Sequence, residues 1–368
     1  MSASPALTVA QVEQALSAWR DPYLDKPVTE TGALTHLAVD DDSVQVQLVF
    51  SYPMEGIATE IRAALTALVA PLVGQRAVRI DVGFKVPPHK ANARLPHVAG
   101  IRNIVAVASG KGGVGKSTTA VNLALALAHE GAKVGLLDAD IYGPSQGVML
   151  GVPNGQRPQI RDGKLFVPIK VHGIESMSMS FLVDENTPMV WRGPMVSSAL
   201  QQMLTQTDWS DLDYLIIDMP PGTGDIQLTL SQRVPVSGAV IVTTPQDIAL
   251  LDAIKGIEMF RKVEIPVLGI IENMSVHICS KCGHVEHLFG EGGGERIASD
   301  FGTVLLGALP LTMQIREQAD AGRPTVVADP DGAVAQIYRN IARLVAARLS
   351  AQAVEQARGG PIILIQDD

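Results

Sequence analysis

Cysteine is almost missing from this sequence, because Cys279 and Cys282 are the two cysteines among 368 residues. A single close pair in a long chain excludes a scaffold of disulfide bonds and leaves both thiols for metal, cluster or redox chemistry. Aromatic residues are also scarce, at 4% of the chain, whereas hydrophobic residues reach 46%. Aliphatic side chains must therefore fill most of the core.

Long apolar runs and basic blocks are missing as well. No uninterrupted apolar stretch reaches the roughly 18 residues that a membrane-spanning helix needs. The start, Met1-Ser-Ala-Ser-Pro5, lacks the basic and apolar segments of a secretory signal. The formal net charge is −9, without the basic and aromatic clusters of nucleic-acid-binding surfaces. We therefore expect a soluble, cytoplasmic protein that has neither nucleic acid nor membrane as a partner.

The segment 1–84 predicts a small α+β domain. Apolar residues at helical spacing indicate helices over 12–19 and 57–72. Alternating apolar residues indicate strands, the clearest of them over 44–50 and 78–82. Adjacent prolines and scattered charges follow, so we assign 85–100 to a linker.

From residue 101 onward, short apolar runs alternate with helical segments. Continuous apolar runs are typical of parallel strands that are buried on both faces. The predicted strands are 104–108, 134–137, 214–217, 239–243, 267–271 and 304–306, with helices such as 117–130 and 249–262 between them. The pattern predicts an α/β fold with a mostly parallel sheet flanked by helices, in a domain over 101–358.

The last predicted helix covers 333–357 and carries an apolar stripe, with Arg339 and Arg343 on the opposite face. A stripe of this kind is typical of a helix that covers a core, which we favour over a helix on a membrane surface. The tail 359–368 follows this domain and has no assigned role.

The segment Gly110-Lys-Gly-Gly-Val-Gly-Lys-Ser117 matches the phosphate-binding pattern G-x-x-x-x-G-K-[ST] at every position. It follows a predicted buried strand and opens a predicted helix, which is the context that the motif requires. Its glycines let backbone N–H groups approach phosphate oxygens, and the positive end of the helix faces the same anion. We expect Lys116 to neutralise the β- and γ-phosphates and Ser117 to offer its hydroxyl to Mg²⁺.

Three aspartates stand at or just after the ends of predicted strands. Asp138 and Asp140 follow 134–137, and Asp218 follows 214–217. Parallel sheets bind ligands at the carboxyl ends of their strands, so we expect these acids to shape a magnesium site and to orient water. A single aspartate in such a place is often only a turn or helix cap, but three together favour a site. The glycine-rich loop 220–225 is a candidate sensor of the γ-phosphate.

The two cysteines have the spacing C-x-x-C, which places two thiolates on one metal or cluster. Three interpretations are open: half of a site shared between two chains, a zinc knuckle, or a redox dithiol. A zinc knuckle would use two of His277, His284 and His287. The glycine after Cys282 and the polar surroundings argue against a redox dithiol. Spacing alone favours zinc, since C-x-x-C near histidine is commonest there.

The phosphate loop, with its additional Lys111, resembles the deviant Walker A loop of the family that includes MinD, ParA and the nitrogenase iron protein. Beyond this loop, the chain resembles the Mrp/ApbC group of iron–sulfur carriers over about 101–325. The motifs that carry this resemblance are Lys111-Gly-Gly-Val-Gly-Lys-Ser117, Asp138-Ala-Asp-Ile-Tyr-Gly-Pro-Ser145, Trp191-Arg-Gly-Pro-Met195, Asp218-Met-Pro-Pro-Gly-Thr-Gly-Asp225, Asn273-Met-Ser275 and Cys279-Ser-Lys-Cys-Gly283. Residues 10–83 look like the small assembly-factor domain often fused in front of such ATPases, although this copy has no cysteine there.

The resemblance implies a homodimer with ATP and Mg²⁺ at two sites near its interface. It implies that Lys111 reaches the nucleotide of the partner subunit and that Asp140 acts on water, so the predicted catalytic residues are Lys111, Lys116 and Asp140. Ser117, Asp138 and Asp218 are the predicted magnesium residues. Asn273 is expected to recognise adenine, although a turn-forming asparagine is nearly as good an interpretation from the sequence alone. The predicted nucleotide-binding residues are Gly110, Gly112, Gly113, Val114, Gly115, Lys116, Ser117, Thr118 and Asn273.

The resemblance also reverses the ranking at the cysteines. Because a cluster usually needs four thiolates and one chain has two, Cys279 and Cys282 of both subunits are expected to hold a bridging, labile [4Fe–4S] cluster. The hypothesis is an ATP-hydrolysing carrier that takes a cluster from a donor or scaffold protein and delivers it to apo-proteins. The alternatives are a MinD- or ParA-like spatial regulator and an ATPase with a structural zinc knuckle.

Overall fold

The computed structural model describes residues 7–89, 95–182, 193–279 and 281–358. Five stretches named above lie outside the described residues: 1–6 of the first segment, 90–94 of the predicted linker, Trp191 and Arg192, Ser280, and the tail 359–368. The chain divides into two compact units. The first is Met1–Pro87 with His129–Gly131 and Ala346–Asp368, and the second is Pro88–Ala128 with Ala132–Val345.

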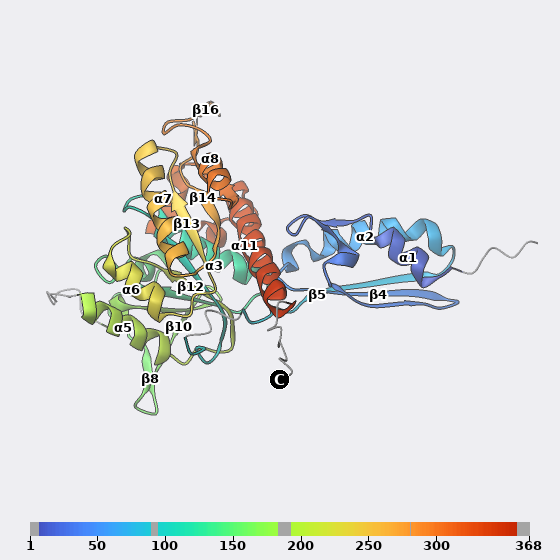
Figure 1. Cartoon of the computed structure of the whole chain (residues 1–368), viewed down its shortest axis with the longest axis horizontal. Coiled ribbons are helices and arrows are strands. Elements are labelled where there is room, and N and C mark those ends of the chain that lie inside the picture. The colour runs from blue at the N-terminus through green and yellow to red at the C-terminus, as the bar shows by residue number, and fades with distance from the viewer. Residues whose placement is uncertain (1–6, 90–94, 183–192, 280, 359–368) are drawn as a thin grey trace, which may run out of the picture. The chain divides into compact units, whose positions relative to one another are not determined.

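The first unit contains a three-stranded sheet in the order β3-β4-β5, in which β3 is antiparallel and β5 parallel to β4 (Figure 1). The strands are β3 (Leu34–Val39), β4 (Ser43–Phe50) and β5 (Ala77–Phe84), and the helices are α1 (Val9–Leu16) and α2 (Ala58–Val73). A short pair, β1 (Arg20–Asp21) and β2 (Lys26–Pro27), and two 3₁₀ turns, Val28–Glu30 and Glu55–Ile57, complete it.

Strand β4 shows how the sequence pattern builds the core of this unit. Val46, Leu48 and Phe50 are at most 2% exposed, whereas Gln45 and Gln47, which alternate with them, are exposed. Alternate side chains of a strand point to opposite faces, so one face of β4 is buried and the other meets water. The alternation that predicted this strand is confirmed.

Helix α1 begins earlier than predicted, at Val9 instead of residue 12, and ends at Leu16. The reason is a capping box at Thr8. The Thr8 hydroxyl accepts a hydrogen bond from the Gln11 backbone N–H at 3.3 Å, and the Gln11 side chain accepts one from the Thr8 N–H at 2.9 Å. These bonds satisfy amides that lack partners at a helix start, and so they stabilise the earlier first turn.

Among the described residues, one helix, Glu55–Val73, has the length and composition to cross a membrane, with a mean hydropathy of 1.5. It consists of α2 and the turn that precedes it. Ile61, Leu65 and Val69 of α2 are buried in the first unit. Core packing therefore accounts for the apolar face of this helix.

The second unit is built around an eight-stranded sheet in the order β10-β11-β7-β12-β6-β13-β14-β17. All neighbours are parallel except the pair β10 and β11, which confirms the predicted mostly parallel α/β sheet. Its strands are β6 (Ile101–Ala108), β7 (Val134–Asp138), β10 (Ile169–Val171), β11 (Ile174–Ser178), β12 (Leu212–Asp218), β13 (Gly238–Thr243), β14 (Val267–Glu272) and β17 (Leu305–Ala308).

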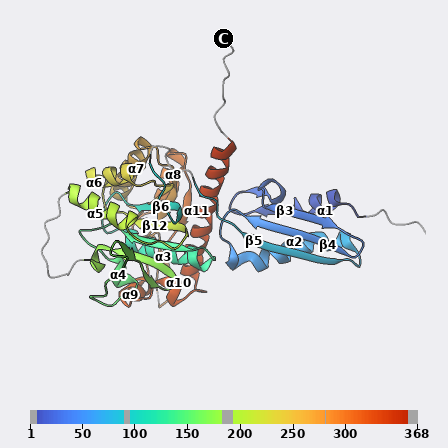
Figure 2. The same cartoon turned by 90° about the horizontal axis from the view of Figure 1, so that it is seen from below.

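Helices flank the large sheet (Figures 1 and 2). Those of this unit are α3 (Lys116–His129), α4 (Gln146–Met149), α5 (Gly193–Thr205), α6 (Asp225–Arg233), α7 (Asp247–Lys262), α8 (Gly293–Asp300), α9 (Met313–Asp320), α10 (Thr325–Ala328) and the first part of α11 (Ala333–Arg358). Residues of α5, α6, α7 and α8, such as Leu200 and Ile257, share one buried cluster with the strands. Helix α3 joins α10 through the Asn122 Oδ1, which accepts a hydrogen bond from the Val326 N–H at 3.0 Å.

Helix α11 differs from its prediction in one respect. Arg339 and Arg343, which the pattern placed on a polar face, are 6% and 3% exposed. The apolar residues Ile341, Val345 and Leu349 are buried too, so the helix is covered on more than its apolar stripe. Burial of this extent supports core packing of α11.

Leu65→Ala in α2 is expected to weaken the hydrogen-exchange protection of β5, against which α2 packs. Leu65 is fully buried, and the cavity left by truncation should lower the opening free energy by about 2–5 kcal/mol. Leu72 lies on the same helix but is 40% exposed, so Leu72→Ala should cost less than about 1 kcal/mol. Hydrogen exchange of the full chain by mass spectrometry measures both, and equal losses would contradict the packing described.

Candidate nucleotide and thiolate sites

The phosphate loop joins the end of β6 to the start of α3. Gly113 and Gly115 have φ angles of +83° and +82°, which favour glycine over residues with a side chain. A Cβ atom on Gly115 would lie 2.1 Å from the Asn273 Nδ2 atom. Gly110 is equally confined, because a Cβ there would lie 2.1 Å from the backbone oxygen of Asp252. Backbone conformation and close packing thus explain glycine at these positions of the motif.

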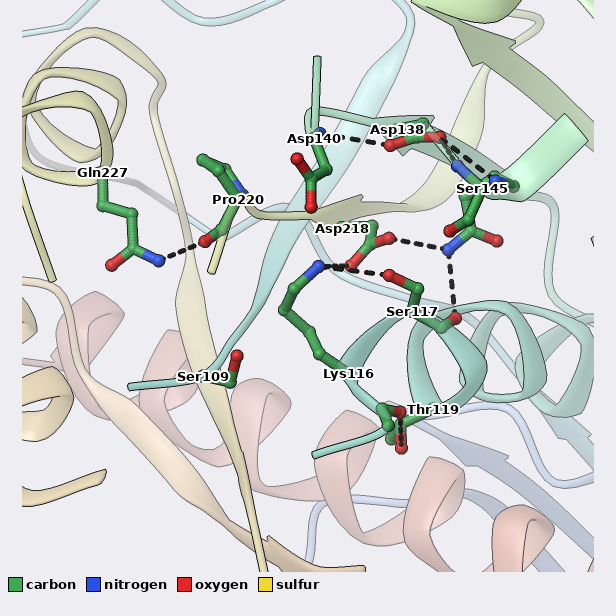
Figure 3. Close-up of polar contacts among 12 residues, drawn as sticks. Ser109, Lys116, Ser117, Thr119, Asp138, Asp140, Ser145, Asp218, Pro220 and Gln227 are labelled. Carbon is green, nitrogen blue, oxygen red and sulfur yellow. Dashed lines mark hydrogen bonds and ion pairs between the residues drawn. The ribbon is translucent and has the colours of Figure 1, made fainter. Parts of the chain in front are cut away.

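Lys116 and Asp218 form a buried ion pair beside this loop (Figure 3). Lys116 is 6% exposed and Asp218 is fully buried. The Lys116 ammonium also donates a hydrogen bond to the Ser117 hydroxyl at 3.2 Å. A buried charge without a partner costs free energy, so each of these two charges lowers the cost of burying the other.

Asp138 lies next to Asp218 because β7 and β12 are adjacent and parallel, with these two residues paired in register. The Asp138 carboxylate accepts hydrogen bonds from the backbone N–H groups of Ser145 at 3.0 Å and Gln146 at 3.1 Å. It also accepts one from the Ser178 hydroxyl at 3.2 Å. Burial, and then the charge of Asp218, raise the pKa of Asp138 to about 7.

Asp140 completes the acidic group. Its backbone N–H donates to the Asp138 Oδ1 atom at 3.1 Å, and its carboxylate points toward Lys116 and Asp218 in Figure 3. Burial raises the pKa of Asp140, and the nearby Lys116 ammonium opposes that shift. The fold therefore places the three predicted aspartates at the carboxyl ends of the neighbouring strands β7 and β12.

The loop that follows Asp218 lies against the phosphate loop. The Gly222 N–H donates to the Ser109 carbonyl at 3.0 Å, and the Met219 N–H donates to the Val107 carbonyl at the same distance. The Gln227 amide of α6 donates to the Pro220 carbonyl. These bonds place the predicted γ-phosphate loop beside the predicted phosphate site.

Asn273 contacts the phosphate loop directly. Its Nδ2 donates to the Val114 carbonyl at 2.8 Å, and its Oδ1 accepts a bond from the Met274 N–H at 2.9 Å. The side chain therefore braces the loop in this structure, and adenine recognition by Asn273 stays a prediction. Lys111 is half-buried, and its carbonyl accepts a bond from the Ser109 hydroxyl at 2.8 Å.

Two further predicted nucleotide-binding residues are Gly112, which is exposed, and Thr118, which stands in the first turn of α3 and is half-buried. The Thr118 carbonyl accepts a hydrogen bond from the Asn122 side chain at 2.9 Å. That bond lies within α3, where a side-chain donor shares the carbonyl with the helix backbone.

The two cysteines lie on a short antiparallel hairpin formed by β15 (His277–Ile278) and β16 (Val285–Glu286). The Cys279 N–H donates to the His284 carbonyl at 2.9 Å, and the Gly283 N–H donates to the Cys279 carbonyl at 2.8 Å. Gly283 has a φ angle of +71°, which lets the chain turn tightly after Cys282. Cys279 is partly exposed and Cys282 is exposed, so both thiols face the outside of this chain.

The surroundings of Cys279 favour its thiolate form. Hydrogen bonds from the backbone of Lys281, and then from that of Cys282, lower the pKa of Cys279. Two of the nearby histidines contact carboxylates: His284 lies 3.6 Å from Glu286 and His287 lies 3.8 Å from Glu291. Across the residues that the structure describes, no three or more His, Cys, Asp or Glu side chains gather as a metal site.

Sequence comparison identifies the family. Residues 100–346 match the family described as the NUBPL iron-transfer P-loop NTPase, and residues 9–82 match the iron-sulfur cluster assembly protein family. The chain belongs to the family of NUBPL iron-transfer P-loop NTPases. The resemblance to iron–sulfur carriers that the motifs indicated is thereby confirmed.

Individual relatives agree with this family. The iron-sulfur cluster carrier protein of Escherichia coli K12 is 53% identical over 346 residues, which are 94% of each chain. The protein of the same name from Pseudomonas fragi is 67% identical over 278 residues, 76% of this chain and 97% of its own. The solved nucleotide-binding protein of Archaeoglobus fulgidus, in complex with ADP, is 36% identical with a TM-score of 0.57, and the match covers 65% of this chain and 93% of that one.

A P-loop NTPase implies Mg²⁺ with its nucleotide, and the side chains present fit that ion. The half-buried Ser117 and the buried Asp138 and Asp218 offer oxygen atoms, which Mg²⁺ prefers. The Gln146 Oε1 atom in the same region is buried and has no hydrogen-bond partner among the described residues. Sequence reasoning missed Gln146, and its one signal is its position directly after the motif that ends at Ser145.

Gly115→Ala is expected to weaken ATP binding by about tenfold or more. The positive φ angle alone costs about 1–2 kcal/mol in a residue with a Cβ atom, and the clash with Asn273 adds to it. Titration with a fluorescent ATP analogue measures the affinity, with circular dichroism as a check of folding. Gly256→Ala in α7 is the matched control, because its Cβ would meet a single neighbour at 3.9 Å. An affinity of Gly115→Ala within about twofold of wild type would contradict this account.

Proposed function

We propose that this protein is an ATP-hydrolysing iron–sulfur cluster carrier, which holds a labile [4Fe–4S] cluster between two subunits and delivers it to apo-proteins. The observation that carries the proposal is one chain with both a complete phosphate loop and an exposed hairpin of two thiols. Membership of the iron-transfer NTPase family supports it. The names of the Escherichia coli and Pseudomonas fragi relatives support the carrier role.

The nucleotide part of the proposal assigns a task to each side chain of the phosphate site. Glycine N–H groups of the loop and Lys116 bind the phosphates, and Ser117, Asp138 and Asp218 hold Mg²⁺. The bound ion would neutralise charge that develops on the phosphates. Asp140 orients the attacking water, Lys111 reaches the partner subunit's nucleotide, and Asn273 reads adenine as well as bracing the loop. The ADP named for the Archaeoglobus fulgidus structure supports a nucleotide at this site.

The cluster is the cargo, and the hairpin supplies half of its ligands. A [4Fe–4S] cluster is usually held by four thiolates, and one chain offers Cys279 and Cys282. Exposure of both thiols and the absence of a gathered third ligand among the described residues support a site completed by a second copy. We therefore propose a homodimer with the cluster on its two-fold axis.

Nucleotide state is proposed to govern cluster retention. Phosphates that bind the loop compete with Asp218 for the Lys116 ammonium, which releases Asp218 toward the metal. The loops after Asp138 and Asp218 would then rearrange, since they bond to these carboxylates or to the phosphate loop. We propose that this change alters the dimer and lets a donor protein load, or an apo-protein receive, the cluster in the cytoplasm.

The domain limits 1–84 and 101–358, with a linker at 85–100, are part of this proposal, and docking of partners is assigned to the first domain.

Anaerobic reconstitution with iron and sulfide is expected to load about two irons and two sulfides per chain, which is one four-iron cluster per dimer. Cys279→Ala and Cys282→Ala should each abolish loading, because each removes two of four thiolates from the dimer. His284→Ala and His287→Ala are matched controls that should load as wild type does. Zinc that wild type retains and that the histidine variants lose would overturn the cluster proposal in favour of a zinc knuckle.

A further inference from the structure

Gln146 stands at the centre of the phosphate site although no sequence motif includes it. The side chain is fully buried, and its Nε2 atom donates to the Asp218 Oδ2 atom at 2.8 Å and to the Ser117 carbonyl at 3.0 Å. Its backbone N–H donates to the Asp138 Oδ2 atom at 3.1 Å. One residue thus touches all three residues that are proposed to hold Mg²⁺.

The two acceptors determine how the amide is turned. Asp218 offers a carboxylate oxygen and Ser117 a carbonyl oxygen, and neither can donate. A flipped amide would place Oε1 against both oxygens, so the hydrogen-bond network assigns Nε2 to this side. The Oε1 atom therefore points away from them.

That oxygen has no partner of its own. The Gln146 Oε1 atom is buried and makes no hydrogen bond with any of the described residues. Buried polar atoms nearly always have a hydrogen-bond partner, so an unpaired acceptor beside a metal-binding group indicates a bound donor. Water molecules in the shell of Mg²⁺ are such donors, because the ion usually keeps several of them.

We propose that Gln146 is a positioning residue of the magnesium site. Its Nε2 atom holds Asp218 and the start of α3 in place, and its Oε1 atom accepts a hydrogen bond from a water molecule of the magnesium shell. Gln146 is also the first residue of α4, so its side chain connects the metal site to the segment that follows Asp138. This inference rests on the proposed function in one respect, namely that the site binds nucleotide with Mg²⁺.

The test measures how nucleotide affinity depends on Mg²⁺ in the full chain. A fluorescent ATP analogue is titrated in EDTA and then at a series of Mg²⁺ concentrations, for wild type, Gln146→Met and Gln146→Asn. Met lacks Oε1, and the shorter Asn side chain withdraws its oxygen from that place. The Mg²⁺ concentration that gives half of the full increase in nucleotide affinity should therefore rise by about tenfold, which is typical when a residue that supports metal ligands is lost. Nucleotide affinity in EDTA should fall by a smaller factor than affinity in Mg²⁺, because the loss of Nε2 affects the site in both conditions, whereas the loss of Oε1 matters only when the ion is bound.

Gln318→Met is the matched control, because Gln318 also has a buried Oε1 atom without a hydrogen-bond partner but lies in α9. Its Mg²⁺ dependence should equal that of wild type. Gln146→Asn keeps a polar amide, so it carries the test if Gln146→Met does not fold.

Two results would overturn the inference. One is a Mg²⁺ dependence of the Gln146 variants that equals that of wild type. The other is a loss of affinity in EDTA by the same factor as in Mg²⁺, which indicates a purely structural role. Either leaves the proposed nucleotide site intact. If wild type itself binds nucleotide without any Mg²⁺ dependence, the magnesium site of the proposed function fails first, and the inference fails with it.

Discussion

The buried ion pair between Lys116 and Asp218 is the interaction on which the phosphate site depends. Two parallel strands end side by side and bring Asp138 and Asp218 into register, and two adjacent carboxylates in a buried place repel each other. Lys116 supplies the compensating charge next to Asp218. Backbone N–H groups and the Ser178 hydroxyl supply hydrogen bonds to Asp138. Lys116 and these hydrogen bonds therefore offset the negative charge of the two carboxylates. A bound phosphate would interact with Lys116, and a bound cation would interact with the carboxylates.

The two proposed ligand sites differ in how far they are exposed to solvent, and each degree of exposure suits its ligand. The carboxylates of Asp138 and Asp218 in the phosphate site are buried, and fixed oxygen ligands of this kind suit Mg²⁺. The cysteines lie on an exposed hairpin whose backbone bonds stabilise a thiolate. A cargo that must pass from one protein to another needs such an accessible site, whereas hydrolysis of ATP needs protection from stray water. One chain can serve both tasks because the sites use different elements of the fold.

Much of the fold and the phosphate site could be predicted because the signals were strong and local. The runs at 104–108 and 214–217 are apolar without interruption since β6 and β12 are central strands, and both were found. Strand β11 was missed because its residues Glu175, Ser176 and Ser178 are polar. They are nonetheless buried, and tertiary bonds such as that of Ser178 to Asp138 make their burial tolerable.

Some site contacts depend on packing that a sequence does not display. The bond of Asn273 to the phosphate loop joins residues that are 159 positions apart, and the place of Gln146 depends on the same kind of long-range packing. The boundary of α1 was misplaced by three residues because the capping box at Thr8 was not weighed against apolar spacing. At the cysteines, spacing alone favours zinc and the family resemblance favours a cluster, so that prediction depends on whole motifs and not on spacing.

The central claim is that nucleotide state controls the cluster, and cluster release tests it most directly. Reconstituted wild type and Lys116→Gln are mixed with an iron chelator, with and without Mg²⁺ and ATP, and the loss of cluster absorbance is followed. Coupling predicts that ATP changes the release rate of wild type by about fivefold or more and leaves that of Lys116→Gln unchanged. Equal rates with and without ATP in a wild-type protein that binds both ligands would contradict the account.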